Sequence, residues 1–343
     1  FVVTPTIEPT LATGWMRTYD GRRFEAPDFL LGTGPAGNLY SSVVDLSKVL
    51  VCLFIHGSAS SDQIISPKML KLMTTPIKGI NGQPEGFGLG FHIKNFDGIT
   101  KIGHGGAVYG FSTQLEALPE RRLGVAAAAS LDGSNGVVKR ITDFALRLMI
   151  AAQDGKPLPA YRMTMQIPPT RAAMLVGMYR EEGGERFTRI TELNGDVFMQ
   201  RGSFRYQLRA SVDDGSIITD DAVGFGMKVS LEEYDRLIVD DIIYVRVTDE
   251  PPAESNATWK GLIGEYGWDH NTLYIYEKDG ALHALIEWTE IDLLEEIEQD
   301  VFAFPDIGMY HGEKVVFHRD PSGRATKGVA ASFEFERRSV GTE

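Results

Sequence analysis

The residues best suited to chemistry surround one histidine. His104 is followed by Gly105 and Gly106, then by Ala107, with Tyr109 shortly after. Paired glycines remove side chains, so a substrate or a neighbouring helix can approach the backbone closely. The backbone N–H of Ala107 could then polarise a carbonyl group, as an oxyanion hole does, while His104 supplies a donor or positive charge beside the developing anion.

The same residues have a simpler interpretation. Short glycine motifs are common in loops, and a histidine in such a loop is often an ordinary surface residue. Spacing alone leaves both interpretations open, and the choice between them depends on the helices and strands that would position His104.

The region before His104 predicts two helices. Ser41 or Ser42 can cap the first, and Asp45 lies in its first turn. Its apolar residues recur at helical spacing: Leu46, Val49, Leu50 and Leu53. Gly57 would end it as a C′ residue. A second, short helix is predicted from Pro67 to Met73, with Ser66 as its cap.

Strand patterns follow, and the segment around His104 reads as a strand edge. Three further strand-like runs are Phe87–Phe96, Gly110–Leu118 and Leu123–Ser130. The small residues of the third run predict a central strand packed closely by helices. A long amphipathic helix then begins at Ser134 or Asn135. Its apolar members include Val138, Ile141, Phe144, Ala145, Leu148 and Met149.

Two separated motifs in this region resemble the penicillin-recognising serine hydrolases. One is the run from Pro35 to Lys48 with its Ser-Ser pair, and the other is His104-Gly105-Gly106 with Tyr109-Gly110-Phe111. The family includes class C β-lactamases, DD-peptidases, esterases and D-aminopeptidases, and the resemblance covers roughly residues 10–150. It implies that His-Gly-Gly is the family's third catalytic motif, that Ala107 N–H is the oxyanion donor, and that Tyr109 contacts substrate.

The chain departs from the family's other two motifs. No Ser-x-x-Lys occurs in the sequence, and the nearest approach, Thr75 to Lys78, begins with threonine and contains Pro76. No Tyr-x-Asn occurs either. In the family both motifs precede the Ser-Ser helix, and the chain begins with Phe1 rather than methionine. The resemblance therefore predicts that a segment upstream of Phe1 supplies the nucleophile.

The C-terminal half predicts two similar β-domains. Leu175–Tyr179 matches Leu262–Tyr266 at an offset of 87 residues (262 minus 175). Downstream, Asn194-Gly195 and Asp279-Gly280 are hairpin signals at an offset of 85 (279 minus 194). Two small antiparallel β-barrels, or sandwiches, fit this spacing. With the His-x-Gly variant, the paired domains most resemble D-aminopeptidases, which implies lipocalin-like barrels.

We therefore expect an α+β protein. Its first domain is the C-terminal portion of a β-lactamase-like α/β domain, an antiparallel sheet with flanking helices, and two β-barrels follow. The predicted boundaries are 1–152 for the hydrolase domain, 153–169 for a proline-rich linker, 170–250 for the first barrel and 257–340 for the second.

Composition narrows the function classes. A formal charge of −13 argues against nucleic-acid binding, and no apolar run approaches the length that spans a bilayer. No cofactor or metal is predicted. The histidines near Trp268-Asp269-His270 and at His283 lack standard ligand spacing. The single cysteine, Cys52, allows no internal disulfide, and the sequence assigns no compartment.

Other C-terminal residues predict structure rather than chemistry. The aromatic residues Tyr266, Trp268, Tyr274, Tyr276 and Trp288 are expected in a barrel core and rim. The acidic run Asp292–Asp300 is expected in a solvated loop or strand edge.

Two functions remain open at this point. The first is a serine hydrolase of amides or esters, acting on small D-residue peptides, β-lactam-like compounds or esters through an acyl-enzyme. The second is a non-catalytic ligand-binding or assembly protein derived from such a hydrolase. If half of an α/β domain lies outside this chain, the apolar faces of the helices at 46–53 and 138–149 are exposed, which predicts a bound complementary segment or a homo-oligomer.

Overall fold

The structure is a computed structural model of the whole chain. It describes residues 3–18, 22–28, 34–55, 58–59, 62–79, 85–233, 235–248, 254, 256–287 and 290–339. The chain divides into two compact units. The first contains residues 1–16, 25–162 and 222–225, and the second contains residues 17–24, 163–221 and 226–343.

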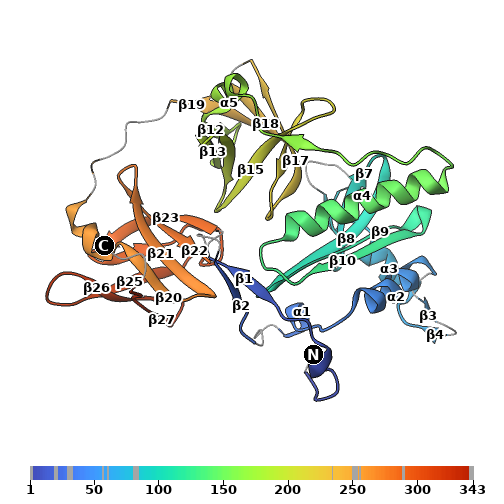
Figure 1. The fold of residues 1–343 in the computed structure, drawn as a ribbon, viewed down its shortest axis with the longest axis horizontal. Helices are drawn as coiled ribbons and strands as arrows, with labels where there is room; N and C mark the ends of the chain where they lie inside the picture. The colour runs from blue at the N-terminus through green and yellow to red at the C-terminus, as the bar shows by residue number, and fades with distance from the viewer. Residues whose placement is uncertain are drawn as a thin grey trace. The chain divides into compact units, whose positions relative to one another are not determined.

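The first unit is built on a six-stranded antiparallel sheet (Figure 1). The strand order is β10-β9-β8-β7-β6-β5. The strands are β5 (Lys78–Gly79), β6 (Gly86–Phe87), β7 (His92–Phe96), β8 (Ile99–Val108), β9 (Phe111–Leu118) and β10 (Leu123–Ala129). Asp97 and Gly98 turn β7 into β8, both with positive φ (50° and 86°), which is the backbone that an Asp-Gly hairpin favours. The predicted strand through His104 is therefore confirmed as β8.

Helices cover both faces of this sheet. Leu50 and Leu53 of α2 (Val43–Phe54) are buried in one cluster with Ile93, Ile102 and Ala117, and Leu70 and Met73 of α3 (Pro67–Met73) pack against it. Leu146 of α4 (Asn135–Gln153) is buried in another, with Phe96 and Leu118. Ile102 and Ala117 pair across β8 and β9, so their side chains share the α2 face.

Two of the three predicted N-caps make a side-chain capping hydrogen bond. Ser42 Oγ accepts a hydrogen bond from the Asp45 N–H, and Ser66 caps α3 in the same way. Ser134 occupies the N-cap position of α4 but makes no side-chain capping bond. The predicted end of α2 at Gly57 lies outside the described residues.

Two predictions for this unit were wrong. The strand at 123–130 is not central: in the described part of the chain β10 pairs on one side only, with β9. Helices do approach it closely, because a Cβ on Gly124 would lie 3.0 Å from Leu50 and 3.1 Å from Phe54. Ile141, assigned to the apolar face of α4, is 54% exposed, since Thr142 and Asp143 take the buried positions instead.

Several short elements complete the first part of the chain. They are η1 (Glu8–Thr10), β1 (Trp15–Arg17), β2 (Arg23–Glu25), α1 (Gly34–Gly37), β3 (Ser58–Ala59), β4 (Asp62–Gln63) and η2 (Pro119–Arg121). Among the helices that the structure describes, none combines the length and the apolar character needed to cross a membrane.

The second unit contains the first barrel, β12 to β19, preceded by β11 (Thr164–Met165) and α5 (Pro169–Leu175). Its eight antiparallel strands close where β19 pairs back onto β12. The strands are β12 (Gly177–Glu181), β13 (Phe187–Leu193), β14 (Asp196–Arg201), β15 (Phe204–Ser211), β16 (Ile217–Asp220), β17 (Phe225–Glu232), β18 (Arg236–Val239) and β19 (Ile242–Val247). Aliphatic side chains such as Leu208 and Val239 fill most of the interior.

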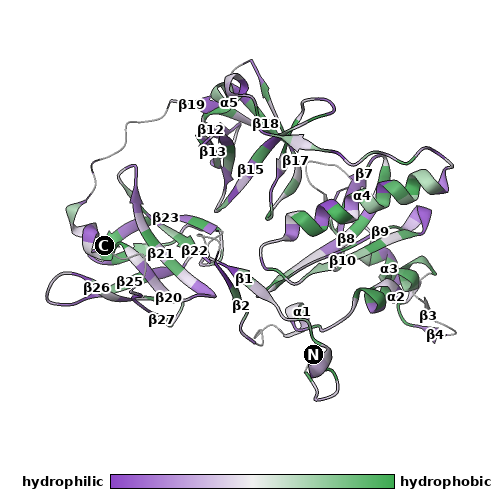
Figure 2. Cartoon of the chain, viewed as in Figure 1, coloured by the Kyte–Doolittle hydropathy of each residue, from purple (hydrophilic) through white to green (hydrophobic). Residues whose placement is uncertain are grey.

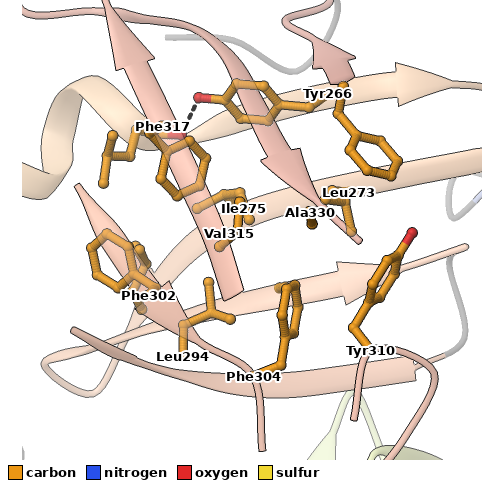
Figure 3. Close-up of a cluster of buried hydrophobic side chains, with 14 of the residues drawn as sticks. Tyr266, Leu273, Ile275, Leu294, Phe302, Phe304, Tyr310, Val315, Phe317 and Ala330 are labelled. Carbon is orange, nitrogen blue, oxygen red and sulfur yellow. Dashed lines mark hydrogen bonds between the residues drawn. The ribbon is translucent and has the colours of Figure 1, made fainter. Parts of the chain in front are cut away.

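The second barrel comprises β20 to β27 and follows η3 (Ala257–Leu262). Its strands are β20 (Gly264–Trp268), β21 (Asn271–Lys278), β22 (Ala281–Ile286), β23 (Glu290–Glu298), β24 (Val301–Ala303), β25 (Lys314–Arg319), β26 (Ala325–Ala330) and β27 (Phe333–Glu336). Figure 3 shows the rings that fill its core. These include Tyr266, Phe302, Phe304, Tyr310 and Phe317, all buried.

The internal repeat is a repeated structural device. A glycine begins the first strand of each barrel with a positive φ: 154° at Gly177 and 150° at Gly264. Two residues later a fully buried tyrosine donates its hydroxyl to the preceding helical turn, Tyr179 to Leu175 O at 2.7 Å and Tyr266 to Leu262 O at 2.6 Å. Near the end of each barrel an arginine lies over this tyrosine ring: Arg246 over Tyr179 and Arg337 over Tyr266.

The predictions for single residues of the second barrel were partly right. Tyr266 belongs to the core, whereas Trp268 is 47% exposed at the rim, and Trp288 lies outside the described residues. Residues 295–299 of the acidic run are exposed as expected. Asp292 is not: it is 1% exposed, because its side chain alternates inward with Leu294 on β23.

Candidate active site

The strand that carries His104 extends beyond its neighbour on one side. β7 pairs with β8 only from Phe96↔Ile99 to His92↔Gly103. On the other side β9 pairs with β8 from Ile102 to Val108. Within the described strands, residues 104–108 of β8 are therefore paired on one edge only. His104 and Ala107 are both exposed.

The register decides which backbone groups face the open edge. Val108 and Phe111 flank the two-residue turn, so they form a hydrogen-bonded pair. In an antiparallel ladder such pairs alternate with non-bonded ones, so Ala107 and Gly105 direct their N–H and C=O groups away from β9. The Ala107 N–H thus points to the open edge of β8.

His104 is held by its own strand. Its Nδ1 lies 2.5 Å from the Gly105 carbonyl oxygen, and since a carbonyl only accepts, Nδ1–H is the donor. A second imidazole is close: the His92 ring centroid lies 5.9 Å from that of His104. Burial lowers the pKa of His92, and the nearby Lys94 and His104 lower it further. Sequence reasoning did not single out His92.

The glycines of the motif have a structural cause besides substrate access. A Cβ on Gly105 would lie 2.9 Å from Gln114 Oε1, and a Cβ on Gly106 would meet the Thr113 hydroxyl. Side chains of β9 therefore occupy the space beside both glycines. Since this crowding comes from the paired strand, the glycine pair alone is no measure of how closely a substrate approaches.

Tyr109 lies in the turn between β8 and β9. It is half-buried, and Gly110 beside it has a φ of 82°. The turn is covered by an earlier segment: the Trp15 N–H donates to Gly110 O at 3.3 Å, and a Cβ on Gly14 would lie 2.7 Å from the Phe111 ring. The structure thus brings Tyr109 to the same end of β8 as Ala107.

A buried charge network lies behind the motif, on the α4 face of the sheet. Lys101 Nζ is 2.8 Å from Glu116 Oε1 and 2.6 Å from Asp143 Oδ1, and all three side chains are buried. Lys139 Nζ reaches the other Asp143 oxygen at 2.8 Å. The two lysines hold the pKa of Asp143 below its ordinary value against the opposing effect of burial.

The sequence analysis missed this network. Lys101 alternates with Gly103 and Gly105 on β8, so they share one face, and Glu116 pairs with Gly103 across β9. Alternation could have placed Lys101 on that face. It could not have identified Asp143, which comes from α4, 42 residues along the chain.

The residues weighed as a metal site do other work. His270 stacks on Trp268 with ring centroids 6.0 Å apart, and Asp269 accepts a hydrogen bond from Arg338. His283 stacks on Tyr276 at 5.3 Å. Across the described ranges, no three histidine, cysteine or carboxylate side chains are grouped so that they could hold a metal ion.

Residues 1–148 match the family model described as Beta-lactamase. Residues 1–148 are therefore similar to the beta-lactamase family. A comparison with curated proteins found no match.

Three solved structures are similar to the chain. An octameric penicillin-binding protein homologue from Pyrococcus abyssi is 22% identical, with a TM-score of 0.39, over 68% of this chain and 53% of that one. SurE with D-Leu is 20% identical (TM-score 0.28, 60% of this chain and 50% of that one). SurE is also 20% identical (TM-score 0.31, 69% and 55%). The chain thus spans about half the length of these structures. At such scores they carry no argument about the site.

Proposed function

We propose that the first unit forms one wall of the active site of a serine hydrolase that cleaves amide or ester bonds through an acyl-enzyme. His104, Gly105, Gly106 and Ala107 form this wall, with the Ala107 N–H as oxyanion donor and Tyr109 beside the substrate. The single observation that carries the proposal is the unpaired edge of β8 at these residues. Backbone N–H groups fixed in a sheet are preorganised donors, and preorganisation is what stabilises a developing oxyanion.

The nucleophile must come from another segment, because residues 1–343 contain no Ser-x-x-Lys. We propose that this segment packs on α2 and α3. Figure 2 shows apolar residues over much of these two helices. Several are exposed although large: Val44, Val51, Ile55, Met69 and Leu72. The segment has a second place to dock, the open edge of β10. This strand pairs with β9 on one side, and its sequence Gly-Val-Ala-Ala-Ala-Ala is typical of a central strand.

Substrate chemistry follows from the same edge. A strand edge with free N–H and C=O groups binds an extended backbone, which favours a small peptide or a β-lactam-like amide, with small esters as the alternative. We also propose specificity for D-residues, because the His-x-Gly motif and the paired barrels resemble those of D-aminopeptidases.

Ala107→Pro tests the proposal. Proline removes the N–H, and β8 tolerates it because Ala107 makes no ladder bond to β9. In the full-length protein, Ala107→Pro should slow labelling by a fluorophosphonate or a fluorescent penicillin by about 10²–10³-fold. Ala107→Ser keeps the N–H and is the matched control. Labelling of Ala107→Pro at the wild-type rate would show that this N–H is not the oxyanion donor.

The 343-residue chain by itself provides the second test. It should not be labelled, and addition of the segment that carries Ser-x-x-Lys should restore labelling. Labelling of the isolated chain would contradict the proposed source of the nucleophile.

A non-catalytic ligand-binding or assembly role is the alternative. It is favoured by the exposed apolar residues of α2 and α3, which would also serve as a contact between copies of the chain. Light scattering on the isolated chain separates these ideas: we expect a homo-oligomer that dissociates when the complementary segment is added. A full-length protein that is never labelled, together with a stable oligomer, would favour the alternative.

A further inference from the structure

Asn135, the first residue of α4, contacts the backbone of β8 from behind. Its Nδ2 donates to the Gly106 carbonyl oxygen at 3.0 Å, and its Oδ1 lies 3.3 Å from Ser112 Oγ, whose single hydrogen also has the Leu131 carbonyl oxygen as an acceptor at 3.0 Å. The reverse amide orientation would set two oxygens against each other at Gly106, so the contact with the Gly106 carbonyl assigns the amide. The sequence had suggested Asn135 only as a helix cap.

The Gly106 carbonyl and the Ala107 N–H belong to one peptide unit. In a trans peptide the two groups point in opposite directions. The Gly106 carbonyl therefore points toward β9 and α4, while the Ala107 N–H points to the open edge of β8. A hydrogen bond to the carbonyl polarises the whole peptide and strengthens the bond that its N–H donates.

We infer that Asn135 is a positioning residue for the oxyanion donor: it fixes and polarises the Gly106–Ala107 peptide through the Gly106 carbonyl. The inference rests on the proposed function, in which the Ala107 N–H meets the developing oxyanion. Asn135 itself touches no reacting atom.

The surroundings hold Asn135 in place. Ser112 on β9 is fully buried, and its Oγ accepts from the Ser134 N–H at 3.0 Å. Ser134 Oγ in turn donates to Leu131 O at 2.7 Å. Farther along α4, the bond from Lys101 to Asp143 ties the helix to β8 a second time. Hydrogen bonds at Ser134 and an ion pair at Asp143 thus hold α4 in place before and after Asn135.

The expected kinetic effect follows from two magnitudes. Loss of an oxyanion donor lowers kcat by about 10²–10³-fold. Cooperative strengthening by a neighbouring hydrogen bond is about 10–30% of the bond. On a logarithmic scale, removing the Asn135 donor should therefore slow acylation about two- to eightfold.

Asn135→Asp is the informative variant. It keeps the size of the side chain, and an acidic residue in the first turn of a helix is favourable, so α4 should remain stable. Its carboxylate cannot donate to the Gly106 carbonyl. Asn135→Ala removes the contact altogether. Val137→Ala is the matched control, since Val137 lies in the same turn and is 38% exposed.

An NMR measurement on the 343-residue chain reads the peptide directly. Gly-Ala occurs only at Gly106–Ala107 and Gly280–Ala281 in the sequence. We therefore expect two peaks in a carbonyl–amide correlation spectrum of protein labelled with carbonyl-¹³C glycine and ¹⁵N alanine. In Asn135→Asp and Asn135→Ala, the Gly106 carbonyl and the Ala107 amide proton should both shift upfield. The Ala281 peak should stay in place, and Val137→Ala should move neither peak.

The outcomes separate this inference from the proposed function. Unchanged Gly106–Ala107 shifts in both variants would overturn the inference. So would shifted peaks with an unchanged labelling rate of the full-length variants. If the full-length wild-type protein is not labelled at all, the proposed function fails, and the spectra still decide whether Asn135 polarises this peptide.

Discussion

The two barrels close by different means, although they descend from one repeated pattern. In the first barrel, β12 and β19 pair over four successive residue pairs, from Met178↔Val247 to Glu181↔Tyr244. In the second barrel, closure within residues 256–287 and 290–339 consists of one bridge, Tyr266↔Arg337, with a further bond from the Arg338 N–H to Glu265 O at 2.7 Å. The second barrel therefore has less backbone pairing at its seam.

In each barrel an arginine side chain also bonds the turn that precedes the first strand. Arg246 of the first barrel donates to Val176 O and Met174 O, both at 2.6 Å, and to the Tyr179 hydroxyl. Arg337 of the second barrel donates to three carbonyls, those of Gly261, Ile263 and Ala325, and to the Tyr266 hydroxyl. Gly261 and Ile263 lie 87 residues after Met174 and Val176 (261 minus 174 and 263 minus 176), so both arginines bond the same two carbonyls of the repeat, and Arg337 adds the Ala325 carbonyl. The guanidinium therefore makes a larger share of the closing bonds in the second barrel, where the ladder is short.

The sharpest test of this comparison replaces each arginine. Arg337→Met should lower the free energy of unfolding of the second barrel by about 3–4 kcal/mol, because several carbonyls lose a charged donor. Arg246→Met should cost the first barrel about 1–2 kcal/mol, since its ladder remains. Native-state hydrogen exchange with mass spectrometry resolves the two barrels. Equal losses would refute the idea that side chains replace the seam.

The second barrel should also differ in its response to pH. Burial, opposed by the Ser203 hydrogen bond and aided by the nearby Glu290 carboxylate, raises the pKa of Asp292 to about 6. The folded form therefore binds its proton more tightly than the unfolded form. Stability should fall as pH rises through about 4 to 6, by at most about 1.4 kcal/mol per pH unit.

Asp292→Asn serves as the control for this pH effect. It removes the titrating group, so the decline in hydrogen-exchange protection of the second barrel between pH 4 and 6 should disappear. Peptides of the first barrel provide the reference in the same samples. An unchanged decline in the variant would assign the effect to another group.

The buried tyrosines should behave alike in the two barrels. Tyr179→Phe and Tyr266→Phe each remove a hydroxyl that donates to a helical-turn carbonyl and accepts from an arginine. Each should cost about 1–1.5 kcal/mol. A clearly larger loss for Tyr266→Phe would place part of the seam's stability in the tyrosine rather than in Arg337 alone.

The smallest expected effect is at the repeated hairpin turns. Asn194 and Asp279 have φ values of 55° and 53°, in the left-handed region that asparagine and aspartate tolerate. Asn194→Ala and Asp279→Ala should each lower stability by about 1 kcal/mol. Asn194→Gly and Asp279→Gly should be nearly neutral. Different losses at the two turns would show that the repeat differs there as well as at the seam.

Local patterns were predictable wherever a residue's neighbours in the chain decide its structure. The Ser42 and Ser66 caps, the Asp97-Gly98 turn and the strand through His104 all depend on residues a few positions away. The repeat of Leu175–Tyr179 at Leu262–Tyr266 likewise predicted two similar β-domains, and the eight antiparallel strands of each barrel agree with it.

Predictions were wrong where distant partners decide. The small residues at 123–130 predict a central strand, yet position in a sheet depends on which strands are present to pair. Asp292 looks solvated within an acidic run, but alternation along β23 turns it inward. Ile141 is exposed because Asp143, drawn inward by Lys101, sets which face of α4 is buried.

The sequence by itself predicted the strand through His104, the resemblance of the first part of the chain to a known family and the repeated β-domains, because short motifs and turn residues act through local backbone geometry. Only the tertiary structure decided that β8 extends beyond the end of β7, so that the Ala107 N–H has no strand partner on that edge among the described residues. It alone placed Asn135 against the Gly106 carbonyl. Both depend on strand register and helix packing, which bring together residues that lie far apart in the chain.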